Sequence, residues 1–171
     1  MVKYSVKLVD HTSGSEKLQP IIQKHLQGYF DEVFADVDDT ATVTWGTAKA
    51  SDTLVLHFVQ DVESSYVSQK LPGNAHRADG GGFTRTQKDV TGSEFYKLPL
   101  VDGKPSQIKA IGYAKLAFHE GMHNKTGMSN TDLHGDKGGG GLASSPPHPA
   151  LTDANKTLMR EAMKKTNAQL Q

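Results

Sequence analysis

The stretch "AFHEGMHNKTG", residues 117–127, combines residue types and spacing that could hold a metal ion and use it. His119 and His123 are four positions apart, and a helix brings side chains at this spacing to one face, where both imidazoles can reach the same ion. Glu120 is offset from His119 by about 100° around the helix, so its carboxylate would flank the ion and not bind it. From there it can take a proton from a metal-bound water and pass it to a leaving amine. The pattern predicts a zinc (Zn2+) site with a general base beside it.

A third metal ligand should follow this helix, because a catalytic zinc typically has three protein ligands and one open position. His134 is the first choice: sets of three histidines are common, and the chain between His123 and His134 is long enough to reverse beyond Gly127. Asp132 could replace it, or could orient the free ring nitrogen of a ligand. The remaining alternatives are Asp136, His148 and, from a later helix, Glu161.

The motif resembles the active-site helix of the zincin metallopeptidases, and within them of the metzincin clan. The resemblance implies that His119 and His123 are zinc ligands and that Glu120 is the general base. Metzincins place a glycine three residues and the third ligand six residues after the second histidine. Here Gly127 comes one residue later than that and Ser129 occupies the ligand position, so the third ligand is atypically spaced.

The same resemblance implies two features outside the helix. One is a turn beneath the metal, a place that "GLASSPP" (141–147) could occupy although it lacks the methionine of the clan. The other is an edge strand near residues 81–86, where an extended peptide would bind as an additional strand.

The elements that must position these residues follow from hydrophobic periodicity. Alternation or β-branched residues predict strands at 2–9, 41–48 and 53–60, with weaker strand signals at 82–86 and 94–105. Ser13 and Glu16 match a capping box that would open a long amphipathic helix. A second helix should begin near 105–106 and end at Gly127, and a third should begin at Thr152. This order predicts an α+β fold over 1–171 as one domain: a small mixed β-sheet with a long backing helix and an active-site helix.

Composition narrows the function. Nineteen basic residues balance nineteen acidic ones, which speaks against nucleic-acid partners, and no run is long and apolar enough for a membrane span. Cysteine is absent, so a metal must be held by histidine or oxygen ligands. No signal peptide is visible, which predicts a cytoplasmic protein or one exported by a non-classical route. The oligomeric state is left open.

The function expected from these observations is that of a zinc metallopeptidase, which hydrolyses peptide bonds through a Glu120-activated, zinc-bound water and takes a peptide or protein as substrate. One alternative is a zinc hydrolase that acts on a non-peptide amide. Another is a non-catalytic protein-binding module in which a structural zinc ion fastens the loop after the helix. Glu120 argues against the module, because a structural site uses four protein ligands and has no need of a free base.

Overall fold

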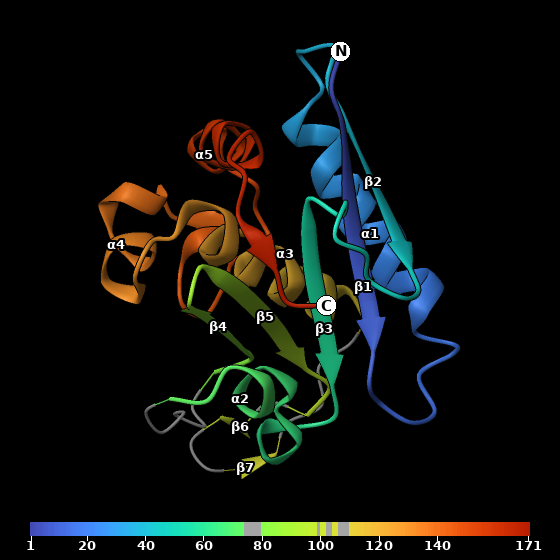
Figure 1. Cartoon of the computed structure of the whole chain (residues 1–171). Coiled ribbons are helices and arrows are strands. Elements are labelled where there is room, and N and C mark those ends of the chain that lie inside the picture. Colours follow the sequence, from blue (N-terminus) through green and yellow to red (C-terminus); the bar gives the residue numbers. More distant parts are fainter. Residues whose placement is uncertain (74–79, 99, 102–103, 106–109) are drawn as a thin grey trace.

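The computed structural model describes residues 1–73, 80–98, 100–101, 104–105 and 110–171 (Figure 1). Its main sheet has the strand order β2-β1-β3-β5-β4, with β8 as a further strand beside β5. The strands are β1 (Lys3–Asp10), β2 (Thr40–Trp45), β3 (Leu54–Val59), β4 (Gly82–Gln87), β5 (Val90–Tyr96) and β8 (Ala168–Gln169). All pairings in this sheet are parallel except that of β4 with β5.

The three long helices contact one another and cover one face of the sheet (Figure 1). They are α1 (Gln19–Val33), α3 (Ala110–Thr126) and α5 (Asp153–Met163). The shorter α2 (Tyr66–Lys70) lies against β4 and β5, and α4 (Asn130–His134) follows α3. The minor elements are a two-stranded sheet of β6 (Leu100–Val101) and β7 (Lys104–Pro105), and three 3-10 turns, η1 (Val62–Ser64), η2 (Asp136–Gly138) and η3 (Gly141–Ala143). The predicted α+β class is confirmed.

The core lies between the sheet and these helices. β3 is buried at all six positions, as expected for a central strand that is covered on both faces. Phe58 of β3 stacks on Phe95 of β5 and also contacts Tyr113 of α3, and Phe118 of α3 packs against Phe30 of α1 with tilted rings. These aromatic contacts fix α3 against the sheet, and α3 is the helix that carries the metal motif. None of the helices within the described ranges is both long and apolar enough to cross a bilayer.

The strands predicted at 2–9, 41–48 and 53–60 agree with β1, β2 and β3 to within a few residues, whereas α2, α4 and β8 were not predicted. The capping box predicted at Ser13 and Glu16 is wrong, because α1 begins at Gln19 after Leu18, whose side chain makes no capping hydrogen bond. Pro20, in the first turn of the helix, explains this start: proline lacks an N–H that the first turn could not use, and its fixed φ suits a helix. The predicted first turn of the motif helix, 106–109, lies outside the described residues.

Candidate metal centre

α3 presents the motif and ends where the sequence predicts. It terminates at Thr126, and Gly127 follows with φ +68°, a left-handed conformation that glycine adopts without steric cost. The Gly127 N–H donates to the carbonyl of His123, 3.0 Å away, and so closes the last turn. The chain can therefore leave the helix directly after the second histidine and turn back.

His134 returns on a short helix and not on the open loop that the polar sequence predicts. The hydroxyl of Ser129 caps α4 by accepting a hydrogen bond from the Asp132 N–H at 3.2 Å. Leu133 is completely buried in the core and anchors this turn. The two contacts explain why a segment rich in polar residues takes a defined course, and they direct the adjacent His134 toward α3.

The three histidines His119, His123 and His134, called the histidine cluster below, converge through their Nε2 atoms. His134 Nε2 lies 3.1 Å from His119 Nε2 and 3.2 Å from His123 Nε2. All three potential ligand atoms lie within 4.8 Å of one another. Among the residues that the structure describes, this is the one group of histidine, aspartate or glutamate side chains arranged closely enough to hold a metal ion. The structure thus brings together the three residues that the sequence predicts as ligands.

The opposite ring nitrogens of the two helix histidines contact backbone carbonyls. His119 Nδ1 is 2.7 Å from the carbonyl oxygen of Leu142, and His123 Nδ1 is 2.9 Å from that of Met128. A carbonyl only accepts, so each Nδ1 must carry a proton, and in a neutral ring Nε2 then has only its lone pair. Burial lowers the pKa of His119 to about 4 and lowers that of His123, which favours the neutral rings. Two lone pairs therefore point toward His134 Nε2, which can donate at most one proton.

A cation bound between the three rings would accept all of these lone pairs, and the separations of the Nε2 atoms fit such an ion. Three nitrogens bound to one ion at about 2.0–2.1 Å would lie roughly 3.3 Å apart in a tetrahedral site and roughly 2.9 Å apart on one face of an octahedron. The separations of 3.1 and 3.2 Å fall between these values. Imidazole nitrogens suit zinc, copper, iron and nickel and are poor ligands for calcium or magnesium. The cluster is therefore able to bind a first-row transition metal ion.

The Glu120 carboxylate is not one of the potential ligands of the histidine cluster, and it faces strand β4. Its side chain is buried, and burial raises the pKa of its carboxyl to about 8, while the hydrogen bond from Thr84 opposes that rise. The Thr84 hydroxyl is 2.7 Å from Oε2 of Glu120. Gly82 leaves the space that the carboxylate occupies, since a Cβ there would lie 2.6 Å from Oε1. Glu120 is thus a buried carboxylate held beside the histidine cluster.

The alternative third ligands lie elsewhere. Asp132 forms an exposed ion pair with Lys137 at 3.0 Å, and Glu161 forms one with Lys164 at 2.7 Å. Asp136 and His148 are exposed on the surface. The predicted role of Asp132 in orienting a ring nitrogen is filled for the two helix histidines by backbone carbonyls. One of these belongs to Leu142 of η3, so the segment "GLASSPP" does reach the cluster.

The sequence interpretation missed the two positions of β4 that surround Glu120. Thr84 and Gly82 lie almost forty residues before the motif. A contact between a strand and a helix so far apart in the chain leaves no local pattern in the sequence. Only the weak strand signal at 82–86, confirmed as β4, indicated that an edge strand passes here. The carbonyl partners of His119 and His123 were equally invisible, because backbone oxygens have no residue signature.

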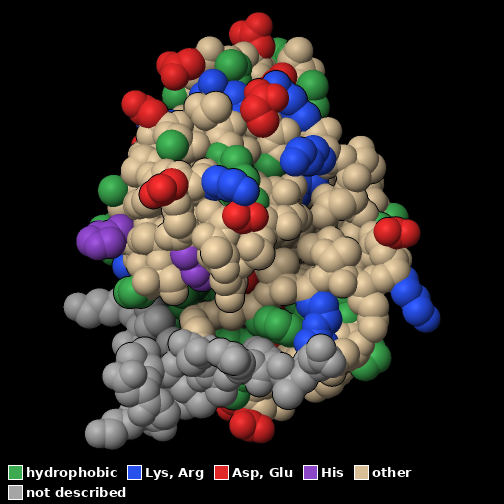
Figure 2. Space-filling view, turned by 90° about the vertical axis from the view of Figure 1, so that its left-hand side faces the viewer, with side chains coloured by type: hydrophobic (Ala, Val, Ile, Leu, Met, Phe, Trp, Pro, Cys, Tyr) green, Lys and Arg blue, Asp and Glu red, His purple; other side chains and the backbone are tan. Residues whose placement is uncertain are grey.

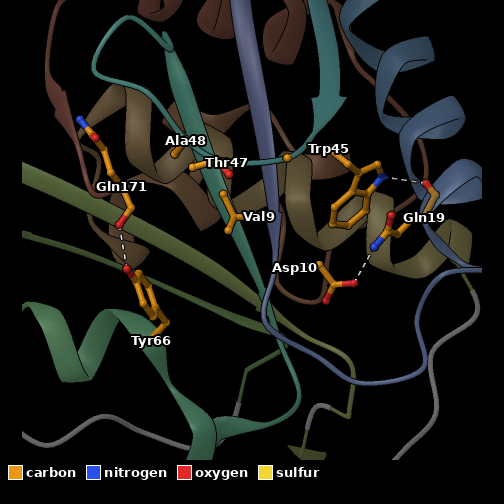
Figure 3. A pocket seen from close by; sticks show the side chains of 9 residues that line it. Val9, Asp10, Gln19, Trp45, Thr47, Ala48, Tyr66 and Gln171 are labelled. Atoms are coloured by element: carbon orange, nitrogen blue, oxygen red, sulfur yellow. Dashed lines mark hydrogen bonds between the residues drawn. The ribbon is translucent and has the colours of Figure 1, made fainter.

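A second feature of the described surface lies away from the histidine cluster. A hollow of about 640 Å³ lies at the ends of β1 and β2, and its lining includes Asp10, Trp45 and Tyr66 but no member of the histidine cluster (Figure 3). The carboxylate of Asp10 is already engaged by Thr12 and Gln19. Figure 2 shows the face that carries α4, where histidine side chains reach the surface and acidic and basic groups are interspersed.

Comparisons with family models, with curated proteins and with solved structures found no match to this chain.

Proposed function

We propose that this chain is a zinc metallopeptidase in which His119, His123 and His134 hold the ion and Glu120 acts as general base. The observation that carries the proposal is the pairing of two features: three converging Nε2 atoms and a buried carboxylate on the residue next to one of them. Zinc bound there would lower the pKa of a water and polarise the carbonyl of a substrate. The proposed cofactor is zinc because three histidines with an open fourth position are typical of catalytic zinc.

Two observations favour an enzyme over a structural zinc module. A structural site is closed by four protein ligands, whereas the group of potential ligands among the described residues has three members. A module would also have no use for Glu120, whose burial raises its pKa and so disfavours its charged form. Such a cost is typical of groups that are retained for chemistry.

In the proposed reaction the residues of the chain move one proton and orient the substrate. Glu120 accepts a proton from the attacking water and donates it to the amine that leaves when the peptide bond breaks. The backbone carbonyls of Leu142 and Met128 accept from the Nδ1–H groups of His119 and His123 and so fix the tautomers of both rings, which would keep their Nε2 lone pairs directed at the ion. The proposal therefore assigns each buried polar group at the cluster a defined role.

Strand β4 supports a peptide as the substrate. It is the last strand in the order β2-β1-β3-β5-β4, so one of its edges has no partner strand among the described residues. It also contacts α3, the helix of the motif. An extended peptide could pair with this edge and would then run beside Glu120, because main-chain pairing is a general way to bind peptides irrespective of sequence.

The test combines metal analysis with hydrolysis. Protein expressed with zinc supplementation should contain about one zinc per chain and should cleave denatured casein or a mixed peptide library. Glu120→Gln should keep the zinc and lose about 10²- to 10⁴-fold in kcat, the usual range for a general base. Glu161→Gln makes the same chemical change on an exposed residue and should have no effect. Protein without zinc, or hydrolysis that survives Glu120→Gln, contradicts the proposal.

A further inference from the structure

The carboxylate of the proposed base is hydrogen-bonded by a side chain of strand β4. Thr84 Oγ1 lies 2.7 Å from Glu120 Oε2, and no other side chain among the described residues hydrogen-bonds this carboxylate. Thr84 is half-buried on β4, whereas Glu120 belongs to α3. The contact therefore crosses from the edge strand to the motif helix and joins the two elements at the base itself.

The hydrogen bonds around Thr84 have a fixed direction. The Asn124 amide Nδ2–H donates to Ser93 Oγ at 3.0 Å, and Ser93 Oγ is 2.8 Å from Thr84 Oγ1. In the ionised state in which Glu120 would act as a base, its carboxylate only accepts, so the Thr84 hydroxyl then donates to Glu120 and its oxygen can accept from Ser93. The chain Asn124–Ser93–Thr84–Glu120 thus holds the Thr84 hydroxyl in one orientation.

Strand β4 also bounds the carboxylate sterically. A Cβ at Gly82 would lie 2.5 Å from Glu120 Cγ, so the strand is in close contact with the side chain there. Gly82 and Thr84 are two positions apart and project toward the same face of the sheet. Glu120 is therefore packed against one position of β4 and hydrogen-bonded to the next one on that face.

We infer that Thr84 is a positioning residue, whose hydroxyl holds the Glu120 carboxylate in the orientation needed for proton transfer. This inference rests on the proposed function. It extends that function by giving β4 two tasks at once, since the strand that would pair with a peptide also orients the base. A small displacement of a reacting group costs rate far more than binding, so the loss of Thr84 should appear in kcat.

The experiment compares Thr84→Val, Thr84→Ser and Thr86→Val in the zinc-loaded full chain. Valine keeps the shape of threonine without the hydroxyl, and serine keeps the hydroxyl. Thr86 is the matched control, because it lies on the same strand and shares a hydrogen bond of 2.9 Å with Thr91. The measurements are zinc content, kcat and KM on a cleaved peptide, and the affinity for acetohydroxamate by calorimetry. Acetohydroxamate chelates zinc and donates its hydroxyl proton to a neighbouring base, so its affinity reports on Glu120 without any turnover.

Thr84→Val should retain zinc and KM but lose about 10- to 100-fold in kcat, the range of a hydrogen bond to a charged group. Its affinity for acetohydroxamate should fall by about 10-fold on the same basis. Thr84→Ser should restore both values, and Thr86→Val should leave them unchanged. If Thr84→Val does not fold, Thr84→Ala replaces it and is compared with Thr84→Ser in the same way.

The outcomes separate the two proposals. Wild-type protein that binds no zinc, or whose hydroxamate affinity does not respond to Glu120→Gln, overturns the proposed function and the role of Thr84 with it. Wild-type protein that depends on Glu120, combined with a Thr84→Val variant of normal kcat and hydroxamate affinity, overturns the role of Thr84 alone. An equal loss in Thr86→Val also overturns it, because the effect would then come from the strand as a whole.

Discussion

The part of the chain that the structure describes contains two groups of neighbouring histidine rings, each built around a buried imidazole, and they differ in how their nitrogens are satisfied. In the first, His57 Nε2 donates to the carbonyl of Leu170 at 2.9 Å, and its Nδ1 accepts from His11 Nε2 at 2.9 Å. Tyr66 stacks on His11 and contacts His57, which completes the packing. In the histidine cluster, by contrast, the Nε2 lone pairs face one another. One group is complete as a neutral protein structure, and the other has an arrangement of lone pairs that a bound cation would satisfy.

The pKa of the rings does not separate the two groups. Burial lowers the pKa of His57 to about 4 and that of His119 to about 4 as well. The perturbation in each case comes mainly from desolvation, which accompanies any buried imidazole whatever its role. In both groups a ring N–H donates to a backbone carbonyl, and what distinguishes them is the partner of the remaining lone pair: that of His57 accepts from His11, whereas those of His119 and His123 both face the Nε2 of His134. Orientation, more than burial, therefore marks the histidine cluster as the candidate metal centre.

The largest effect that we expect follows directly from this contrast. His119→Ala, His123→Ala and His134→Ala should each weaken zinc binding by roughly 10³-fold, since one of three ligands to an ion bound with about 10–16 kcal/mol is removed. His57→Ala is the control for loss of a buried histidine and should leave the zinc affinity of the folded protein unchanged. Competition titration with a chromogenic chelator measures all four variants. If His57→Ala lost as much zinc affinity as the cluster variants, the proposed distinction between the two groups of histidines would be wrong.

A second test moves the base and leaves the ligands in place. In Gly82→Ala the new methyl group meets the flexible Glu120 side chain, which must shift. A displacement of about 1 Å at a reacting group can cost on the order of 10²-fold in rate, so kcat should fall by that amount while zinc content stays constant. Gly28→Ala on α1 is the matched control, because nothing lies within 4 Å of a Cβ added there. Unchanged kcat in Gly82→Ala would show that the position of this carboxylate is irrelevant.

The third prediction concerns the stability contributed by His57. Its pKa is about 4 in the folded protein and 6.5 as the ordinary value, so the unfolded chain binds the proton more readily. The stabilisation is fully present above pH 6.5 and is lost as the pH falls toward 4, by on the order of 3 kcal/mol over the whole window. Urea unfolding of chelator-treated wild type and His57→Gln at pH 7 and pH 4.5 measures it. The wild type should lose more stability than the variant on acidification, and equal losses would contradict the assignment.

The sequence predicts the centre well where chemistry and local periodicity coincide. His119 and His123 share a helical face, and Gly127 must end that helix, so the reversal of the chain and the approach of His134 follow from short-range rules. The strands β1, β2 and β3 and the long helices follow from the same kind of information, because their hydrophobic periods are strong. The capping box at Ser13 failed because Pro20, a few residues later, fixes a better start.

The rest depends on contacts between segments that are far apart in the chain. Thr84 meets Glu120 only because β4 pairs with β5 and α3 packs across both. Leu142 accepts from His119 through its backbone, which any residue could supply. Such contacts are set by tertiary packing, and a single sequence carries no periodic trace of them. This is why a side chain could be proposed as ligand from the sequence while its supporting oxygens could not.

The smallest effect that we expect is that of Asp132→Ala on zinc affinity, and it tests the role that the sequence predicts for Asp132 against the one that the structure shows. If Asp132 were the partner of a ring nitrogen, its removal would lower the metal affinity by about 10- to 100-fold. The structure instead places its carboxylate in an exposed ion pair with Lys137, a type of contact that contributes about 0–1 kcal/mol. Asp132→Ala should therefore change zinc affinity by no more than about 3-fold.

Ser129→Ala is the variant with which the effect of Asp132→Ala on zinc affinity is compared. Ser129 caps the helix that carries His134, and loss of such a cap costs about 1 kcal/mol, so its removal should weaken zinc binding by about 5-fold. Both variants leave the three ligands intact, and the same chelator titration measures them side by side. A larger loss in Asp132→Ala than in Ser129→Ala would return Asp132 to the metal centre. The expected order instead indicates that α4 supports His134 through its cap and through the buried Leu133, and not through the charge of Asp132.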